Sequence, residues 1–219
     1  MQPLTGIKVL DMTQFESGTV CTETLAWLGA EVWKIERPGK GEQGRYSADD
    51  PEKETFGFAI LNMNKKSVTC NVKTHEGLEL IRKLAERADV FVENMAPGTI
   101  ERLGLGYEEC KKLNPRLVYA SIKGFSKDSP YAGYPAFDPI AAYMGGFVAS
   151  TGTPEFPVKS GINVADSGSG MTCALAIVSA LFQRERDGQG QRVDVAMQDF
   201  MIGFGRAAWE PYYINGKKA

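Results

Sequence analysis

The order of the first three apolar segments constrains the fold of this chain more than any other feature. Residues 7–12 and 31–36 have the composition of short buried strands, and residues 19–28 between them place apolar side chains at helical spacing until Gly29 ends the run. A strand, helix and strand joined this closely form a right-handed crossover, which makes the two strands parallel. The sequence therefore predicts that the chain begins with a βαβ unit.

The same alternation continues along the chain and predicts an α/β fold, a Rossmann-like and mostly parallel sheet flanked by helices. Residues 37–64 are polar and rich in Gly, Pro and Asp, which indicates a long loop. The other predicted elements are strands at 67–72, 90–94, 117–122 and 192–196, a helix at 74–88 capped by Thr74, a short helix opened by Pro97-Gly98, and a helix from Asp166 to about Arg186.

Residues 198–213 are mostly apolar and aromatic, and no closing element follows them. These aromatic side chains need a surface to cover them, so the chain looks cut short.

The charge and composition of the chain argue against some classes of binding partner. A formal net charge of -2 gives no broad cationic field for nucleic acid or an acidic membrane surface. The N-terminus lacks the pattern of a signal peptide, and no apolar run approaches the ~20 residues of a membrane span, so we expect a cytoplasmic protein. The widely spaced Cys21, Cys70, Cys110 and Cys173 suit reduced structural thiols.

Several common site motifs are missing from the sequence. The turn after the first strand, residues 11–18, lacks the three spaced glycines that bind a dinucleotide, and Gly104-Leu-Gly106 follows no strand. We therefore expect no nicotinamide cofactor. His75 is the only histidine and should lie exposed at the start of a helix, and no cluster of metal-ligand residues is recognisable. We expect no metal.

Asp166 is the strongest candidate for chemistry. It follows a strand-like run and precedes a long helix, within the glycine-containing segment 161–171, where glycines let a substrate approach closely. An aspartate is ionised at neutral pH and can attack an activated acyl group without a general base. The alternative is that Asp166 only caps the helix, which is a common place for Asp. The pattern alone leaves both interpretations open.

Five segments together resemble class III CoA-transferases, and the resemblance covers essentially the whole chain. Within that family the pattern is similar to that of the formyl-CoA:oxalate CoA-transferases. The segments are Leu4–Asp11, Leu28–Arg37, Val92–Gly98, Ala165–Met171 and Gly188–Asp199.

The resemblance implies that Asp166 is the catalytic nucleophile. In the family this aspartate attacks an acyl-CoA thioester, the resulting mixed anhydride is converted to an aspartyl-CoA thioester, and an acceptor carboxylate reverses the sequence. Each tetrahedral intermediate needs hydrogen-bond donors for its oxyanion. The chain offers the backbone after Asp166 and Gly145-Gly146, whereas family members add a glycine-rich loop from the later half of the enzyme.

The resemblance also implies a site for coenzyme A, the acyl-CoA substrate. Arginine and lysine can pair with its phosphates, and asparagine and strand-end backbone with its adenine and pantetheine groups. The matching positions are Phe15, Glu16, Ser17, Arg37, Asn71, Val72, Lys73, Asn94, Met95 and Arg102.

The predicted substrate pocket departs from the formyl-CoA transferase pattern. Glu16 replaces a Gln, Phe137-Asp138 replaces a Tyr-Glu pair, and Tyr46 lies near the position of a Trp; Gly145 and Gly146 complete the predicted pocket. A negative Glu16 repels a second carboxylate, so we expect a monocarboxylate or bulkier acceptor rather than oxalate.

The resemblance implies an acyl-CoA donor, a carboxylic acid acceptor and an interlocked homodimer of the full-length enzyme. It also implies that residues 1–198 form one large domain and that residues 199–219 begin a connecting segment toward a small domain, so we expect the chain to be the N-terminal part of a longer enzyme. One alternative within the family is an α-methylacyl-CoA racemase, but Phe137 occupies the place of its histidine. A second alternative is a non-catalytic CoA-binding subunit or fragment, in which these residues contribute no complete active site. An NAD-dependent oxidoreductase remains only as a possibility of the general fold.

Overall fold

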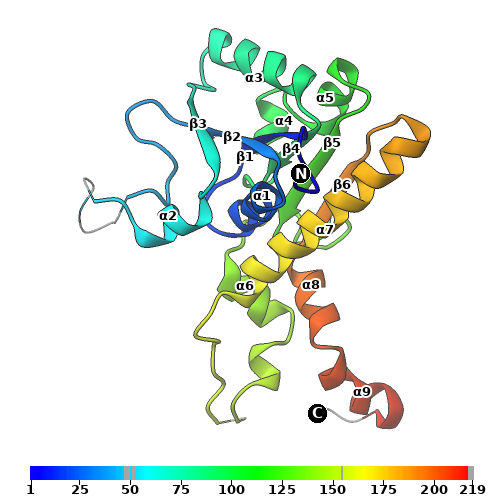
Figure 1. Cartoon of the computed structure of the whole chain (residues 1–219). Coiled ribbons are helices and arrows are strands. Elements are labelled where there is room, and N and C mark those ends of the chain that lie inside the picture. The colour runs from blue at the N-terminus through cyan, green and yellow to red at the C-terminus, as the bar shows by residue number, and fades with distance from the viewer. Residues whose placement is uncertain (47–49, 51–52, 154, 217–219) are drawn as a thin grey trace.

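The protein is built on a six-stranded parallel sheet with the strand order β3-β2-β1-β4-β5-β6 (Figure 1). The computed structural model describes residues 1–46, 50, 53–153 and 155–216. This topology confirms the predicted Rossmann-like α/β fold. The strands are β1 Lys8–Met12, β2 Glu31–Glu36, β3 Lys65–Thr69, β4 Val90–Glu93, β5 Val118–Lys123 and β6 Arg192–Ala196.

Helices cover both faces of the sheet, and alternating strand residues supply the two cores. In β1, Val9 packs against α1 (Ser17–Trp27) and α7 (Val164–Asp187), whereas Leu10 packs toward α3 (His75–Arg87) and α5 (Tyr107–Leu113). The central strands β1, β4 and β5 are buried on both faces, as is usual for parallel sheets, whereas the edge strands β3 and β6 are partly exposed. The single histidine, His75, is exposed at the start of α3, as predicted, in the layer opposite α7.

The remaining helices supplement this three-layer body, and some of them add buried side chains to its two cores. Figure 1 shows α6, α8 and α9 extending beyond the end of the sheet at which β5 and β6 terminate. Their bounds, with those of the short elements, are α2 Phe56–Leu61, α4 Thr99–Arg102, α6 Asp138–Met144, the 3-10 turn Val148–Ser150, α8 Met197–Phe204 and α9 Arg206–Asn215.

The strand order reverses between β1 and β4, because the chain runs outward from β1 through β2 to β3 and then returns to β4. The loops that follow β1 and β4 diverge at such a point and leave a crevice where parallel α/β proteins bind ligands. Thr13–Glu16 connects β1 to α1, and Asn94 follows β4. The fold therefore positions a site among these loops.

The structure differs from the sequence prediction in three places. The predicted loop at 37–64 contains α2, which Thr55 caps by accepting a hydrogen bond from the Phe58 amide. Helices α5 and α6 were not predicted. No strand precedes Asp166: Ile162 is exposed in an irregular segment, and Asp166 lies in the first turn of α7.

Two glycines of α7 are required by packing. A Cβ at Gly170 would lie 2.4 Å from the Ser17 carbonyl oxygen of α1, and a Cβ at Gly168 would lie 2.1 Å from the Phe200 ring of α8. The glycines beside Asp166 thus admit neighbouring helices, rather than the substrate that the sequence suggested. At 24 residues α7 is long and apolar enough to cross a membrane, but its buried side chains pack on α1 and the sheet as those of a core helix.

Candidate active site

The loop between β1 and α1 is fixed by Asn94 from the adjacent strand. The Asn94 Oδ1 atom accepts a hydrogen bond from the Gln14 amide at 2.8 Å, and its Nδ2 donates to the Gln14 carbonyl at 2.8 Å and to the Ser17 hydroxyl at 3.2 Å. The Asn94 side chain thus satisfies both the backbone amide and the backbone carbonyl of Gln14. The predicted CoA-binding residue Asn94 therefore also shapes this loop.

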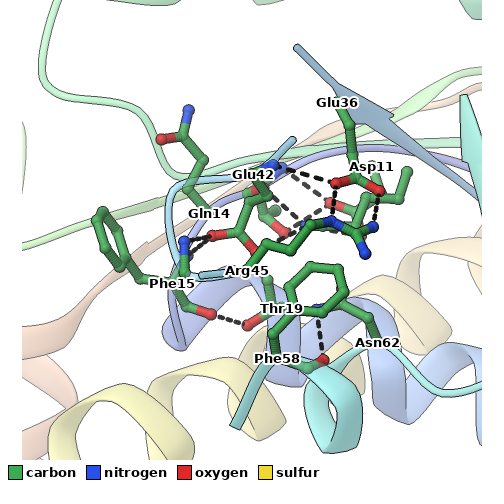
Figure 2. Close-up of polar contacts among 12 residues, drawn as sticks. Asp11, Gln14, Phe15, Thr19, Glu36, Glu42, Arg45, Phe58 and Asn62 are labelled. Atoms are coloured by element: carbon green, nitrogen blue, oxygen red, sulfur yellow. Dashed lines mark hydrogen bonds and ion pairs between the residues drawn. The ribbon is translucent and has the colours of Figure 1, made fainter. Parts of the chain in front are cut away.

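A buried carboxylate holds the same loop from the other side. Glu42, in the segment after β2, accepts hydrogen bonds from the Phe15 amide at 2.8 Å and the Gly44 amide at 2.7 Å. Phe15 has a φ of 59°, a left-handed conformation that is uncommon for a bulky residue and that needs such support. Figure 2 shows Glu42 directed at the Phe15 backbone, with the Glu36–Arg45 pair close by.

A set of buried charges supports Glu42 from beneath. Lys34 donates to the Thr13 carbonyl at 3.0 Å, and its Nζ lies 3.6 Å from the second Glu42 carboxylate oxygen. Lys65 from β3 lies 3.3 Å from Asp11. Burial opposes the charge on Asp11, but Lys34 and Lys65 outweigh it and hold the pKa of Asp11 below its ordinary value. The loop thus rests on paired charges rather than apolar contacts.

The first turn of α7 is capped by a side chain from a different helix. The buried carboxylate of Asp138, at the start of α6, accepts hydrogen bonds from the Ala165 amide at 2.8 Å and the Asp166 amide at 3.2 Å. Asn163, at the N-cap position, makes no side-chain cap of its own. Asp166 is therefore not the cap, and the interpretation that it serves only to cap the helix is wrong.

Glu16 joins the β1–α1 loop to α7. One of its carboxylate oxygens accepts a hydrogen bond from the Asn163 side-chain amide at 2.6 Å, and the other accepts from the Ser167 hydroxyl at 2.8 Å. These two partners bracket Asp166 in the sequence. The segment that was predicted from CoA-transferases to contact CoA, Phe15–Ser17, is in this way brought to the candidate nucleophile.

Asp166 lies in an environment that disfavours its charge. Its side chain is buried, and burial together with the negative charges of Glu16 and Asp138 raises the pKa of Asp166 from 3.8 to about 7. A hydrogen bond with Ser17 and the positive charge of Lys159 act in the opposite direction. Strongly perturbed carboxylates of this kind are concentrated at functional sites. A carboxylate that gains from losing its charge is suited to becoming acylated.

Most of the predicted CoA-binding residues lie at the carboxyl-terminal end of the sheet. Arg37 follows β2, residues 71–73 follow β3, and Asn94 and Met95 follow β4, so all of them lie at the carboxyl ends of neighbouring parallel strands. Val72 and Met95 pack partly against the core beneath. The described cations Arg37, Lys73 and Arg102 are exposed, and Arg102 donates to the Thr99 hydroxyl at 2.9 Å.

The predicted substrate-pocket residues do not all lie together. The Phe137 ring contacts the Phe15 ring edge-to-face, with centroids 5.5 Å apart, beside the Glu16 loop. Tyr46 instead forms an isolated antiparallel β-bridge with Glu54, in the segment between β2 and α2.

Gly145 and Gly146 end helix α6 and pack against later helices. Their amides donate to the carbonyls of Ala141 and Tyr143. A Cβ at Gly145 would meet Met201, and one at Gly146 would meet Trp209. The geometry thus corrects the prediction that these amides donate to an oxyanion, because both already bond within α6.

Sequence reasoning missed three residues of this site. Asn163 and Ser167 hold Glu16, and Lys159 lies 3.9 Å from the second oxygen of Asp138. No motif marks them, because their roles depend on contacts with residues that are distant in sequence. Only their closeness to Asp166 along the chain could have drawn attention to them.

The chain belongs to CoA-transferase family III, whose family model matches residues 4–219. It is 44% identical over 204 residues to a formyl-CoA:oxalate CoA-transferase of Streptomyces avermitilis and 44% identical over 206 residues to one of Escherichia coli O139:H28. Each match covers 93% of this chain and 50% of the relative. The chain thus spans about half the length of these curated relatives.

Solved structures show the same fold at similar identity. A CAIB/BAIF family protein from Brucella suis superposes with a TM-score of 0.94 at 37% identity, covering 100% of this chain and 59% of that one. A hypothetical protein from Mycobacterium tuberculosis superposes with a TM-score of 0.90 at 34% identity, covering 99% and 61%. The family prediction made from the sequence is confirmed.

Proposed function

We propose that the protein containing these residues moves CoA from an acyl-CoA thioester to a carboxylic acid, with Asp166 as the covalent nucleophile. The main support is the buried Asp166 carboxylate at the first turn of α7, held beside the loop where the strand order reverses. Family membership supplies the reaction class, and the formyl-CoA:oxalate CoA-transferase activity of its relatives makes CoA the transferred group.

The chemistry follows from the surroundings of Asp166. The ionised carboxylate attacks the thioester carbonyl, the carbon–sulfur bond breaks, and CoA leaves as its thiolate. The thiolate then attacks the Asp166 carbonyl of the mixed anhydride, which yields an aspartyl-CoA thioester and releases the donor carboxylate. Both covalent forms of Asp166 are neutral.

The neutral intermediates relieve an existing repulsion. Burial and the charges of Glu16 and Asp138 disfavour the free carboxylate, as its raised pKa of about 7 indicates. Acylation removes that charge and with it the unfavourable interaction, so the pocket favours loading of Asp166. The same pocket resists a second negative charge, which agrees with a monocarboxylate or bulkier acceptor rather than oxalate.

For CoA we propose the exposed edge defined by Arg37, Asn71–Lys73, Asn94–Met95 and Arg102. Arg37, Lys73 and Arg102 are suited to phosphates, and the loop Phe15–Ser17 would place the thioester end beside Asp166. Tyr46, Phe137 and Asp138 remain candidates for the surroundings of the acyl group.

The cellular and quaternary assignments are also proposals. We propose a cytoplasmic enzyme that forms an interlocked homodimer, with residues 1–198 in the large domain and 199–219 leading toward a second domain. The exposed aromatic side chains of α8 and α9 support such a continuation, since Phe204 and Tyr213 are largely uncovered here.

The racemase alternative requires a second acid–base group beside Asp166. Phe137 stands next to Asp138 at the start of α6, and the only histidine lies in the opposite helical layer. A chain with this arrangement lacks the histidine that would exchange the α-proton.

The test is turnover by the complete protein after Asp166→Ala substitution. We expect the variant to lose transferase turnover while calorimetry still detects CoA binding. The matched control is Asp199→Asn, since Asp199 is exposed in α8. Turnover that survives the Asp166 substitution contradicts the proposal. CoA binding without turnover in the wild type would instead support the alternative of a CoA-binding subunit.

A further inference from the structure

The acceptor must bring its carboxylate to a pocket that already holds the carboxylates of Glu16 and Asp138, while Asp166 is held as a neutral thioester. At the first turn of α7, Asp138 accepts a hydrogen bond from the amide of Asp166, and Glu16 accepts one from the Ser167 hydroxyl. Like charges in a partly buried site repel one another more strongly than in water. An acceptor carboxylate therefore needs a cation at the same place.

Lys159 is a cation in that position. It lies in the segment that leads into α7, and its Nζ is 3.9 Å from Asp138 Oδ2. The other Asp138 oxygen, Oδ1, accepts from the amides of Ala165 and Asp166. One carboxylate thus connects Lys159 to the backbone of Asp166, which places the ammonium group beside the reacting residue.

The Lys159 ammonium is held loosely. Its hydrogen bonds are long, 3.3 Å to the Ser160 carbonyl and 3.5 Å to Asn163 Oδ1, and 37% of its side chain is exposed. By contrast, Lys123 donates at 2.6 to 2.8 Å to Glu93 and the Met95 carbonyl. Lys123 is committed to a structural clamp, whereas Lys159 keeps hydrogen-bonding capacity for another anion.

The cations predicted for CoA occupy a different part of the surface. Arg37 and Lys73 follow β2 and β3, and Arg102 ends α4, whereas Lys159 precedes α7 on the side of α6. The phosphates and the acceptor would therefore have separate positive partners.

We propose that Lys159 is the residue that binds the acceptor carboxylate beside Asp166. This inference rests on the proposed transferase function. The bound carboxylate attacks the aspartyl-CoA carbonyl, CoA leaves as its thiolate, and the thiolate then attacks the acceptor carbonyl and restores the Asp166 carboxylate. Lysine suits this task because its ammonium is a compact point charge on a flexible stem.

The experiment compares Lys159→Gln, Lys159→Arg and Lys127→Gln in the complete protein, with acetate and longer monocarboxylates as acceptors. Lys127 is an exposed lysine in the turn after β5 and serves as the matched control. We expect K159Q to raise the acceptor KM by roughly 10- to 100-fold, the effect of losing a hydrogen bond to a charged group. The donor KM and kcat should change much less, K159R should recover part of the loss, and K127Q should behave as wild type.

Three results would overturn the inference. An unchanged acceptor KM in K159Q means that another group binds the carboxylate. Comparable increases in the acceptor KM and the donor KM, together with a loss of thermal stability, mean that Lys159 only supports Asp138 and the N-terminal end of α7. Absence of any acyl adduct on Asp166 in the wild type removes the transferase function itself, and mass spectrometry of the wild type detects that failure separately from an effect confined to the acceptor.

Discussion

Replacing Asp166 by Asn should stabilise this chain, and the gain should grow with pH. The pKa of Asp166 in the folded state, about 7, lies above its ordinary value of 3.8. The folded state therefore binds the Asp166 proton more tightly than the unfolded state does, and the free energy of unfolding falls as pH rises from 3.8 to about 7. The difference corresponds to about 4 kcal/mol once both states are ionised. Asparagine removes this penalty, so D166N should be more stable than wild type by about 2 kcal/mol at pH 5 and about 4 kcal/mol at pH 8.

Urea unfolding of both proteins at several pH values measures this effect. Groups that do not interact with Asp166 cancel in the difference, so its increase from pH 5 to pH 8 reports Asp166 together with its interactions with Glu16 and Asp138. Asp128→Asn, at an exposed turn residue, is the control and should show no such increase. A stability difference that stays constant with pH, or that favours wild type at pH 8, would refute the argument that burial and neighbouring carboxylates disfavour the charge.

Two further predictions test the packing and the loop. Gly168→Ala should destabilise the chain by about 1–3 kcal/mol, because its Cβ would collide with Phe200. Gly203→Ala, where a Cβ meets open space, should be neutral or stabilising, and thermal unfolding that ranks the two variants equally would contradict this. Glu42→Ala should cost about 3 kcal/mol, because it removes the nearer of the two carboxylates beside buried Lys34 and leaves two amides without their acceptor. Glu42→Gln, which keeps an acceptor oxygen, should cost less in urea unfolding; equal costs would mean that the loop does not depend on this acceptor.

The sequence predicted the sheet well because its central strands are buried on both faces. Short segments with several apolar residues, such as 7–12 and 31–36, are typical of such strands, and Thr74 marked the start of α3 correctly. Helices α2, α5 and α6 were missed because they are only 6 or 7 residues long, too short for helical periodicity to stand out. The segment before Asp166 was misread as a strand because Ile162 and Val164 alternate with polar residues, although Ile162 is exposed.

The site was predictable only in part, for a physical reason. Asp166 could be found by its place before a long helix and by resemblance to the family. Its raised pKa could not, since it arises from burial and from the charges of Glu16 and Asp138, and only the fold produces either effect. The cap that Asp138 supplies across helices leaves no local pattern, and the same is true of Lys159. Long-range contacts of this kind are invisible to spacing arguments.

Covalent trapping shows directly whether Asp166 is the nucleophile. The complete protein is incubated briefly with a panel of acyl-CoA donors, treated with hydroxylamine or borohydride, and digested for mass spectrometry. We expect a hydroxamate or a reduced side chain at Asp166 with at least one donor. Absence of modification with every donor, in a protein that still binds CoA, would contradict the covalent route.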